Sequence, residues 1–139
     1  MTSTTAPSRT DIALAAVRIV TGGILAAHGA QKLFIYGIAG VTGAFEGMGV
    51  PMAGVLAPIV TGIEFLGGIA LVLGLFTPIA GLLLAAVMAG AFFQVHLAAG
   101  FFLPNGVEFV LVLGTAALAF ASAGPGHYSL DALRARRRN

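Results

Sequence analysis

Among the polar and charged side chains that interrupt the long apolar stretches of this sequence, seven are the main candidates for chemistry. They are Arg18, His28, Gln31, Lys32, Glu64, His96 and Glu108. A charge near the centre of a bilayer costs about 2.5–3.5 kcal/mol on insertion scales, so such groups need partners or water. Imidazoles and carboxylates can transfer protons, and a lysine can stabilise a developing oxyanion. The set therefore suits proton-coupled chemistry inside a membrane, or ion pairs that fix helix packing.

The composition is that of a membrane protein. The chain has 139 residues, of which 58% are hydrophobic and 9% charged, whereas soluble domains carry about 25% charged residues. Its length suits four membrane spans in one domain. The arginines at positions 134 and 136–138 account for four of the seven basic residues. This distribution predicts a tail anchored at anionic lipid rather than a nucleic-acid surface.

The sequence contains no cysteine. Disulfides, thiol redox pairs, iron–sulfur clusters and thiolate zinc sites are thereby excluded. The residue types suggest no other metal site. If the protein handles electrons, we expect the redox group to be bound from outside.

Hydropathy predicts an all-α membrane protein with a bundle of four transmembrane helices. The expected spans are residues 12–35, 53–76, 78–99 and 106–123. Between the first two lies a glycine-rich connection, residues 36–51, in which positions 45–48 could form a short helix. We expect residues 1–11 to be a flexible N-terminus and residues 124–139 a basic tail. Arg9 and the tail arginines predict that both termini are cytoplasmic.

Position within each span predicts how the polar residues are arranged. Counted from the span midpoints at about 1.5 Å per residue, five fall in one outer layer: His28, Gln31, Lys32, His96 and Glu108. Arg18 and Glu64 lie deeper and are expected to pair, either structurally or as a proton relay. We expect His96 to face inward because Glu108 would otherwise lack a partner. Lys32 could instead extend to the interface, and both histidines could be hydrogen-bonded core residues.

Six motifs resemble the DoxX family of small bacterial membrane proteins. In chain order, they are His28-Gly-x-Gln31-Lys32, Phe45-Glu46-Gly-Met-Gly-x-Pro51, Glu64-x-x-Gly67-Gly68 with Leu73-Gly74-Leu75-x-Thr77-Pro78, His96-x-x-x-Gly100-Phe-Phe, Gly106-x-Glu108-Phe, and Gly124-Pro125-Gly126-x-x-Ser129-Leu-Asp131. The resemblance implies four helices in the bacterial inner (plasma) membrane and an association with oxidoreductases. Some relatives are described as subunits related to DoxD of a thiosulfate:quinone oxidoreductase. Others are described as membrane partners of superoxide dismutase and a thiosulfate sulfurtransferase.

Three functional hypotheses remain open from the sequence. The first is a membrane subunit of a redox complex, linked to sulfur or oxidative-stress metabolism, that binds a quinone at the outer polar cluster. The second is a non-catalytic scaffold that recruits soluble redox enzymes. The third is a small-solute carrier, which would require a homo-oligomer. Haem ligation by His28 and His96 is an alternative that we rank below quinone binding.

Overall fold

The computed structural model describes residues 8–138, and every regular element within that range is a helix. Three continuous helical stretches are long and apolar enough to cross a membrane: Arg9–Gly47, Ala53–Leu73 and Thr77–Ala99. The fourth apolar helix, α6 (Glu108–Ala123), has 16 residues and spans about 24 Å at the α-helical rise. It is shorter than the predicted span of residues 106–123.

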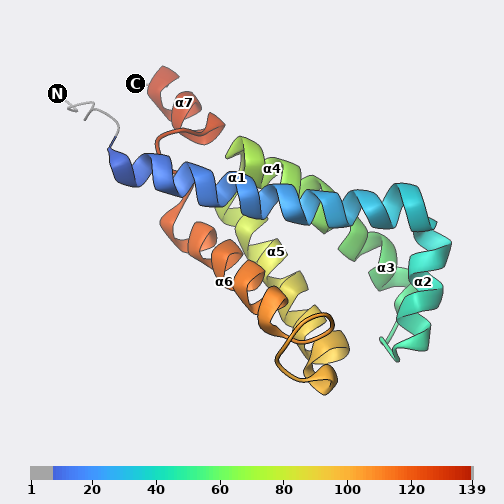
Figure 1. The fold of residues 1–139 in the computed structure, drawn as a ribbon. Coiled ribbons are helices and arrows are strands. Elements are labelled where there is room, and N and C mark those ends of the chain that lie inside the picture. The colour runs from blue at the N-terminus through green and yellow to red at the C-terminus, as the bar shows by residue number, and fades with distance from the viewer. Residues whose placement is uncertain (1–7, 139) are drawn as a thin grey trace.

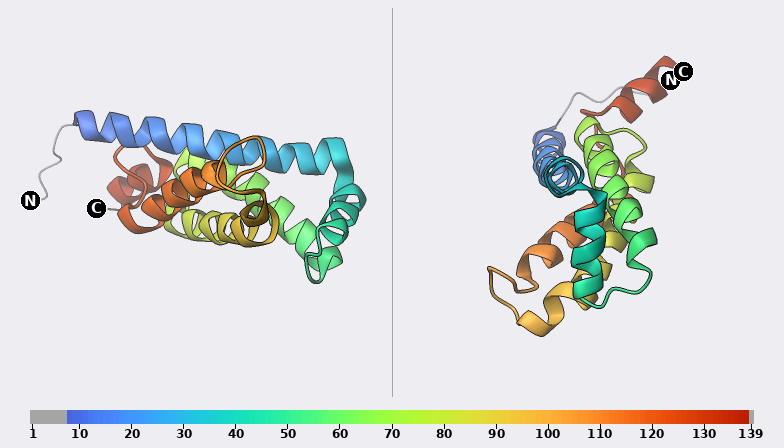
Figure 2. Two further views of the ribbon diagram at one scale, coloured as in Figure 1. Left: turned by 60° about the horizontal axis from the view of Figure 1, so that its bottom comes forward. Right: turned by 90° about the vertical axis from the view of Figure 1, so that its right-hand side faces the viewer.

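The first helical stretch starts at a capping box and bends at Gly37. Ser8 caps α1 (Arg9–Ala30), accepting a hydrogen bond from the Asp11 N–H while the Asp11 carboxylate accepts one from the Ser8 N–H. A π-helical segment, η1 (Gln31–Tyr36), continues α1. At Gly37, whose φ is +68°, the chain turns into α2 (Gly37–Gly47), which runs steeply away from the α1 axis (Figures 1 and 2).

The prediction of a long connection at residues 36–51 is wrong, because most of this segment forms helix α2. Eleven of these residues form a regular helix, not only positions 45–48. In an apolar environment a helix satisfies the backbone hydrogen bonds internally, and this requirement overrides the weak helix propensity of glycine. The irregular part shrinks to the short turn before α3.

The second and third stretches form an antiparallel pair. Helix α3 (Ala53–Gly62), π-helical η2 (Ile63–Gly67) and α4 (Gly68–Leu73) follow one another without a break. After a tight turn come α5 (Thr77–Ala91), π-helical η3 (Phe92–His96) and a short 3₁₀ turn, η4 (Leu97–Ala99). These bounds lie within a few residues of the predicted spans 53–76 and 78–99.

Helix α6 returns along α5, and α7 (Leu130–Arg137) follows it. Ser129 caps α7 by accepting a hydrogen bond from the Ala132 N–H. The beginning of α1 and the whole of α7 lie at the same end of the molecule (Figures 1 and 2).

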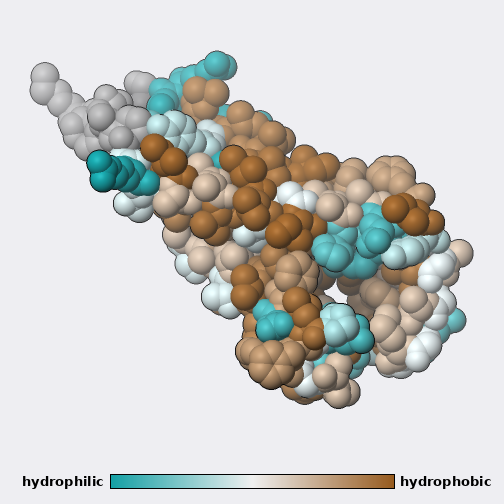
Figure 3. Space-filling model, viewed as in Figure 1, coloured by the Kyte–Doolittle hydropathy of each residue, from teal (hydrophilic) through white to brown (hydrophobic). Residues whose placement is uncertain are grey.

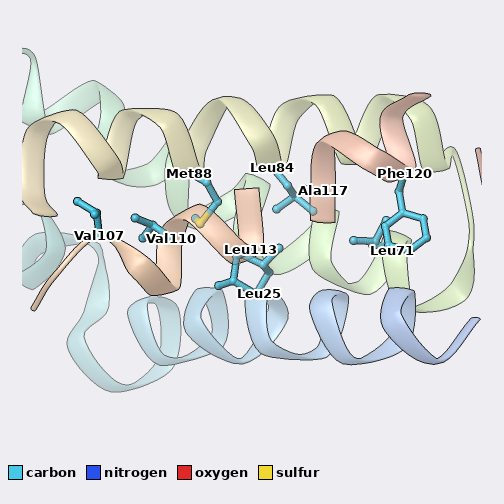
Figure 4. Packing of buried hydrophobic residues seen from close by; sticks show 9 residues of the cluster. All are labelled: Leu25, Leu71, Leu84, Met88, Val107, Val110, Leu113, Ala117 and Phe120. Atoms are coloured by element: carbon cyan, nitrogen blue, oxygen red, sulfur yellow. The ribbon is translucent and has the colours of Figure 1, made fainter. Parts of the chain in front are cut away.

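The hydrophobic core lies between α1, α4, α5 and α6. Figure 4 shows side chains from these four helices meeting in one layer. Its fully buried members include Leu25, Leu71, Leu84 and Ala117. The core is narrow, because most other large apolar side chains point away from it.

Glycines set the closest helix contacts. A Cβ on Gly22 would lie 2.7 Å from the Gly68 carbonyl oxygen, and one on Gly68 would lie 2.4 Å from the Ala26 nitrogen. Likewise, a Cβ on Gly81 would lie 2.6 Å from the Ala117 carbonyl oxygen. Small residues allow such backbone approach between membrane helices.

The outer surface is strongly apolar. Side chains such as Val20, Phe34, Leu66 and Phe93 are at least 60% exposed, and apolar residues cover much of the face in Figure 3. A soluble monomer rarely exposes apolar patches of this extent. The chain is therefore a helical membrane protein whose outer face contacts lipid.

Candidate functional site

Three π-helical segments carry four of the predicted site residues. Gln31 and Lys32 lie in η1, Glu64 in η2, and His96 in η3. In a π-helical turn each backbone hydrogen bond joins residues five apart in sequence instead of four. Such turns are rare and are frequently found at functional sites. Each of the first three helical stretches thus has a π-helical segment that carries at least one of the predicted site residues, whereas Arg18 and His28 lie in α1.

Lys32 and Glu64 form an ion pair between η1 and η2. The Glu64 side chain is 4% exposed and that of Lys32 is 23% exposed. The two segments meet because Gly29 lies directly against the backbone of Phe65: a Cβ there would be 2.3 Å from the Phe65 nitrogen. The pair therefore depends on a glycine one turn before the lysine.

The predicted pairing of Arg18 with Glu64 is wrong. Gly22 packs against Gly68 and Gly29 against Phe65, which places Glu64 level with the end of α1. Arg18 precedes Lys32 by 14 positions and so lies about 21 Å away along the helix axis. Register is set by these glycine contacts, not by aligned span midpoints.

Arg18 instead binds backbone carbonyls at the opposite end of the bundle. Its side chain is 1% exposed. Nη1 donates to the Leu71 carbonyl at 2.9 Å and to the Val72 carbonyl at 3.2 Å, and Nη2 donates to the Tyr128 carbonyl. The guanidinium thus donates to carbonyls in the last turn of α4, and it ties α4 to the segment before α7.

His96 and Glu108 do not pair as predicted. His96 Nδ1 lies 2.8 Å from the Asn105 carbonyl oxygen, while the Glu108 carboxylate accepts a hydrogen bond from the Leu103 N–H at 2.6 Å. Because a carbonyl can only accept, His96 Nδ1 carries the hydrogen in this contact. Both side chains hold the loop between η4 and α6, which supplies the partners that the prediction overlooked.

An inner cavity of about 230 Å³ brings four of the polar residues together. His28, Lys32, Glu64 and His96 line it, together with apolar side chains from α5 and α6. The His28 ring lies 6.0 Å from the ring of Phe109, measured between centroids. Three helical stretches thus place a cation, a carboxylate and two imidazoles around one small space.

A larger groove of about 540 Å³ lies on the other side of the ion pair. It runs between α3 and α5 beneath α2, and Lys32, Glu64 and His96 line its polar end. These three residues, which we call the polar triad, border both the groove and the inner cavity. Figure 3 shows the surface hollowed between α2 and the lower ends of α5 and α6, beside a hydrophilic patch over the end of α1.

The other predicted residues lie outside the polar triad. Gln31 borders two more open depressions along η1. Glu108 does not line the inner cavity. Gln94, which α-helical geometry would turn away from His96, lines the same groove. Within residues 8–138 no three metal-ligating side chains cluster.

The DoxX family model matches residues 13–97, which is more than half of the chain. The chain belongs to the DoxX family. A relative from Haemophilus influenzae, named "Uncharacterized protein", is 38% identical over 125 residues, covering 85% of this chain and 87% of the relative. A second, from Bacillus subtilis, is named "Putative oxidoreductase CatD"; it is 31% identical over 121 residues, covering 87% of this chain and 86% of the relative. No solved structure matches the chain.

Two of the DoxX-like motifs meet at the end of the bundle that carries α7. The Asp131 carboxylate accepts hydrogen bonds from the Phe76 and Thr77 N–H groups, each at 3.0 Å, and the Asp131 N–H donates to the Gly74 carbonyl at 2.9 Å. A Cβ on Gly74 would lie 2.1 Å from Arg18 Nη1. We call this contact of Arg18, Gly74 and Asp131 the tail lock. It gives the Gly74 motif and the Asp131 motif a structural role.

Proposed function

We propose that this DoxX-family chain is a membrane subunit of a redox system and binds a quinone-type ring against the polar triad. The supporting observation is the position of the Lys32–Glu64 pair, beside His96, between two cavities. A buried ion pair adds little stability compared with apolar side chains of similar size. Its presence in an apolar bundle therefore favours a role in binding.

The residues of the polar triad suit a ring with two carbonyl oxygens. Reduction of a quinone to a quinol takes two electrons and two protons, and an associated soluble oxidoreductase would supply the electrons. Lys32 can donate a hydrogen bond to a ring oxygen and stabilise negative charge there. Glu64 and His96 can hold or transfer the protons. The relative named as an oxidoreductase is consistent with this chemistry.

The proposal includes a topology in the bacterial inner membrane, with several spans and both termini cytoplasmic. The start of α1, where Arg9 lies, and the arginine-bearing α7 are at the same end of the molecule, and cytoplasmic segments of membrane proteins are enriched in such residues. The η4–α6 loop and α2 then face the outside, and the polar triad lies in the outer half of the bundle.

The direct test is binding of a tail-less benzoquinone, 2,3-dimethoxy-5-methyl-1,4-benzoquinone, to the purified protein in nanodiscs. Losing one hydrogen-bonding group should weaken binding about tenfold, so we expect this effect for His96→Ala. Glu108→Gln is the matched control. Glutamine still offers an oxygen to the Leu103 N–H, and position 108 lines neither the groove nor the inner cavity. Equal affinities for all three proteins would refute the ring site.

A scaffold function is the second candidate, and the surface of α7 favours it. Leu130 and Leu133 are about 40% exposed, and Arg134, Arg136 and Arg137 occupy its last turn. Truncation after Ala132 would remove the basic end but keep the Asp131 contacts. If the membranes of a strain with this truncation retain their soluble redox enzymes at wild-type amounts, the scaffold hypothesis fails.

A further inference from the structure

The groove between α3 and α5 changes from polar to apolar along its length. At its inner end are Lys32, Glu64 and His96. Away from them its walls are formed by apolar residues of α3, η2 and α5, together with one residue of α2 and the residue that follows α2: Leu56, Ile59, Val60, Ile63, Leu83, Ala86, Val87, Gly90, Phe45 and Met48. Its volume of about 540 Å³ lies within the usual range for ligand pockets, about 300–1,000 Å³.

The apolar end of the groove opens on the outside of the bundle. Helices α3 and α5 lie close together near η2 and diverge toward α2 (Figures 1 and 2). Ile59 and Leu83, one on each wall, are 50% and 45% exposed. In a membrane this side of the helices contacts acyl chains, so a ligand can enter from the bilayer without crossing water.

We infer that the ligand is an amphipathic, lipid-soluble quinone whose apolar tail lies in the α3–α5 groove while its ring contacts the polar triad. This inference rests on the proposed ring site and adds the ligand class, its orientation and its route of entry. The charged pair and His96 at one end, with mainly apolar walls elsewhere, match a molecule with one polar head and one long apolar tail.

Gly90 offers a way to block the tail without touching the triad. It lies on the α5 wall of the groove, and a Cβ built there meets nothing within 4 Å. Gly90→Leu therefore adds a side chain on the groove wall whose Cβ contacts no neighbouring atom. Gly23→Leu is the matched control: Gly23 is also an open helical glycine, on α1, and borders none of the cavities described.

The experiment compares two quinones that share a ring, decylubiquinone and its tail-less analogue, in nanodiscs containing each protein. We expect Gly90→Leu to weaken decylubiquinone binding by about tenfold or more, because the tail is excluded sterically. Binding of the tail-less ring should change less than about twofold, a difference too small to indicate a lost contact. Gly23→Leu should match the wild type for both. If Gly90→Leu does not fold, Ala86→Leu on the same wall tests the same contact.

The outcomes separate the two proposals. If the wild type binds both quinones and Gly90→Leu weakens both equally or neither, the tail does not lie in this groove, although the ring site stands. If the wild type binds neither quinone, the ring site itself is refuted and the groove inference fails with it.

Discussion

At the residue scale, the central feature is an opposite-charge pair inside an apolar bundle. Lys32 and Glu64 are held together across two helical stretches, and Glu64 is almost fully buried. Removing one member of a buried pair costs about 3–5 kcal/mol, whereas replacing both with apolar side chains of similar size is often neutral. Stability alone therefore gives no reason to keep the pair.

Single substitutions in the pair should differ in severity. Lys32→Met leaves Glu64 buried without its cation and should lower the free energy of unfolding by about 3–5 kcal/mol. Glu64→Leu should cost less, because the partly exposed Lys32 can extend toward water. The double variant Lys32→Met/Glu64→Leu should return close to wild-type stability. Unfolding by SDS titration measures all three; a double variant less stable than either single one would contradict this reasoning.

At the element scale, glycine contacts and π-helical segments determine which residues meet. Gly29 allows η2 to approach α1, and this approach brings Glu64 to Lys32. The π-helical segments of the first three stretches contain Lys32, Glu64 and His96. Neither feature adds chemistry of its own, but both determine the position of the side chains that do.

Gly29→Ala should separate the helices that carry the ion pair. The added Cβ would lie 2.3 Å from the Phe65 nitrogen, so the backbones must move apart at a cost of about 1–3 kcal/mol. Gly23→Ala, at an open position, should be neutral or slightly stabilising. Thermal unfolding in detergent compares the two; equal melting temperatures would show that the close approach is not required.

The sequence predicts the helical segments well and their mutual register poorly. Hydropathy locates the second, third and fourth helical stretches to within a few residues, whereas the first continues to Gly47, twelve residues beyond its predicted end. The Arg18–Glu64 error arose because register depends on contacts between residues distant in sequence. The π-helical turns have no local signature, and α2 was missed because glycine-rich segments favour helix only where the backbone is shielded from water.

At the scale of the whole molecule, the tail lock connects the C-terminal segment to the bundle. Asp131 caps the start of α5, and Arg18 binds carbonyls of both α4 and the segment before α7. The lock lies at the end of the molecule where α1 begins, far along α1 from the polar triad. We therefore assign it a structural role.

Asp131→Ala should destabilise the bundle without changing the ring site. Two N–H groups at the start of α5 lose their acceptor, and loss of a helix cap costs about 0.5–2 kcal/mol. Truncation after Ala132 keeps this cap and should be milder. Melting temperature and benzoquinone affinity together check the prediction. If folded Asp131→Ala binds the benzoquinone more weakly, the tail lock also affects the ring site and the purely structural assignment is wrong.

The absence of cysteine from the sequence allows the proposed topology to be tested with single introduced cysteines. Asn105→Cys lies in the η4–α6 loop and should react with a membrane-impermeant maleimide added to spheroplasts. Arg138→Cys, after α7, should react only once the membrane is permeabilised. The reverse pattern would place the termini outside.

The central claim is that the Lys32–Glu64 pair serves ligand binding rather than stability, and one measurement tests it most directly. Benzoquinone affinity is measured in nanodiscs for the wild type and for Lys32→Met/Glu64→Leu, with unfolding of both proteins followed in parallel. We predict that the double variant is as stable as the wild type and binds the quinone at least about tenfold more weakly. A folded double variant with wild-type affinity would contradict the claim.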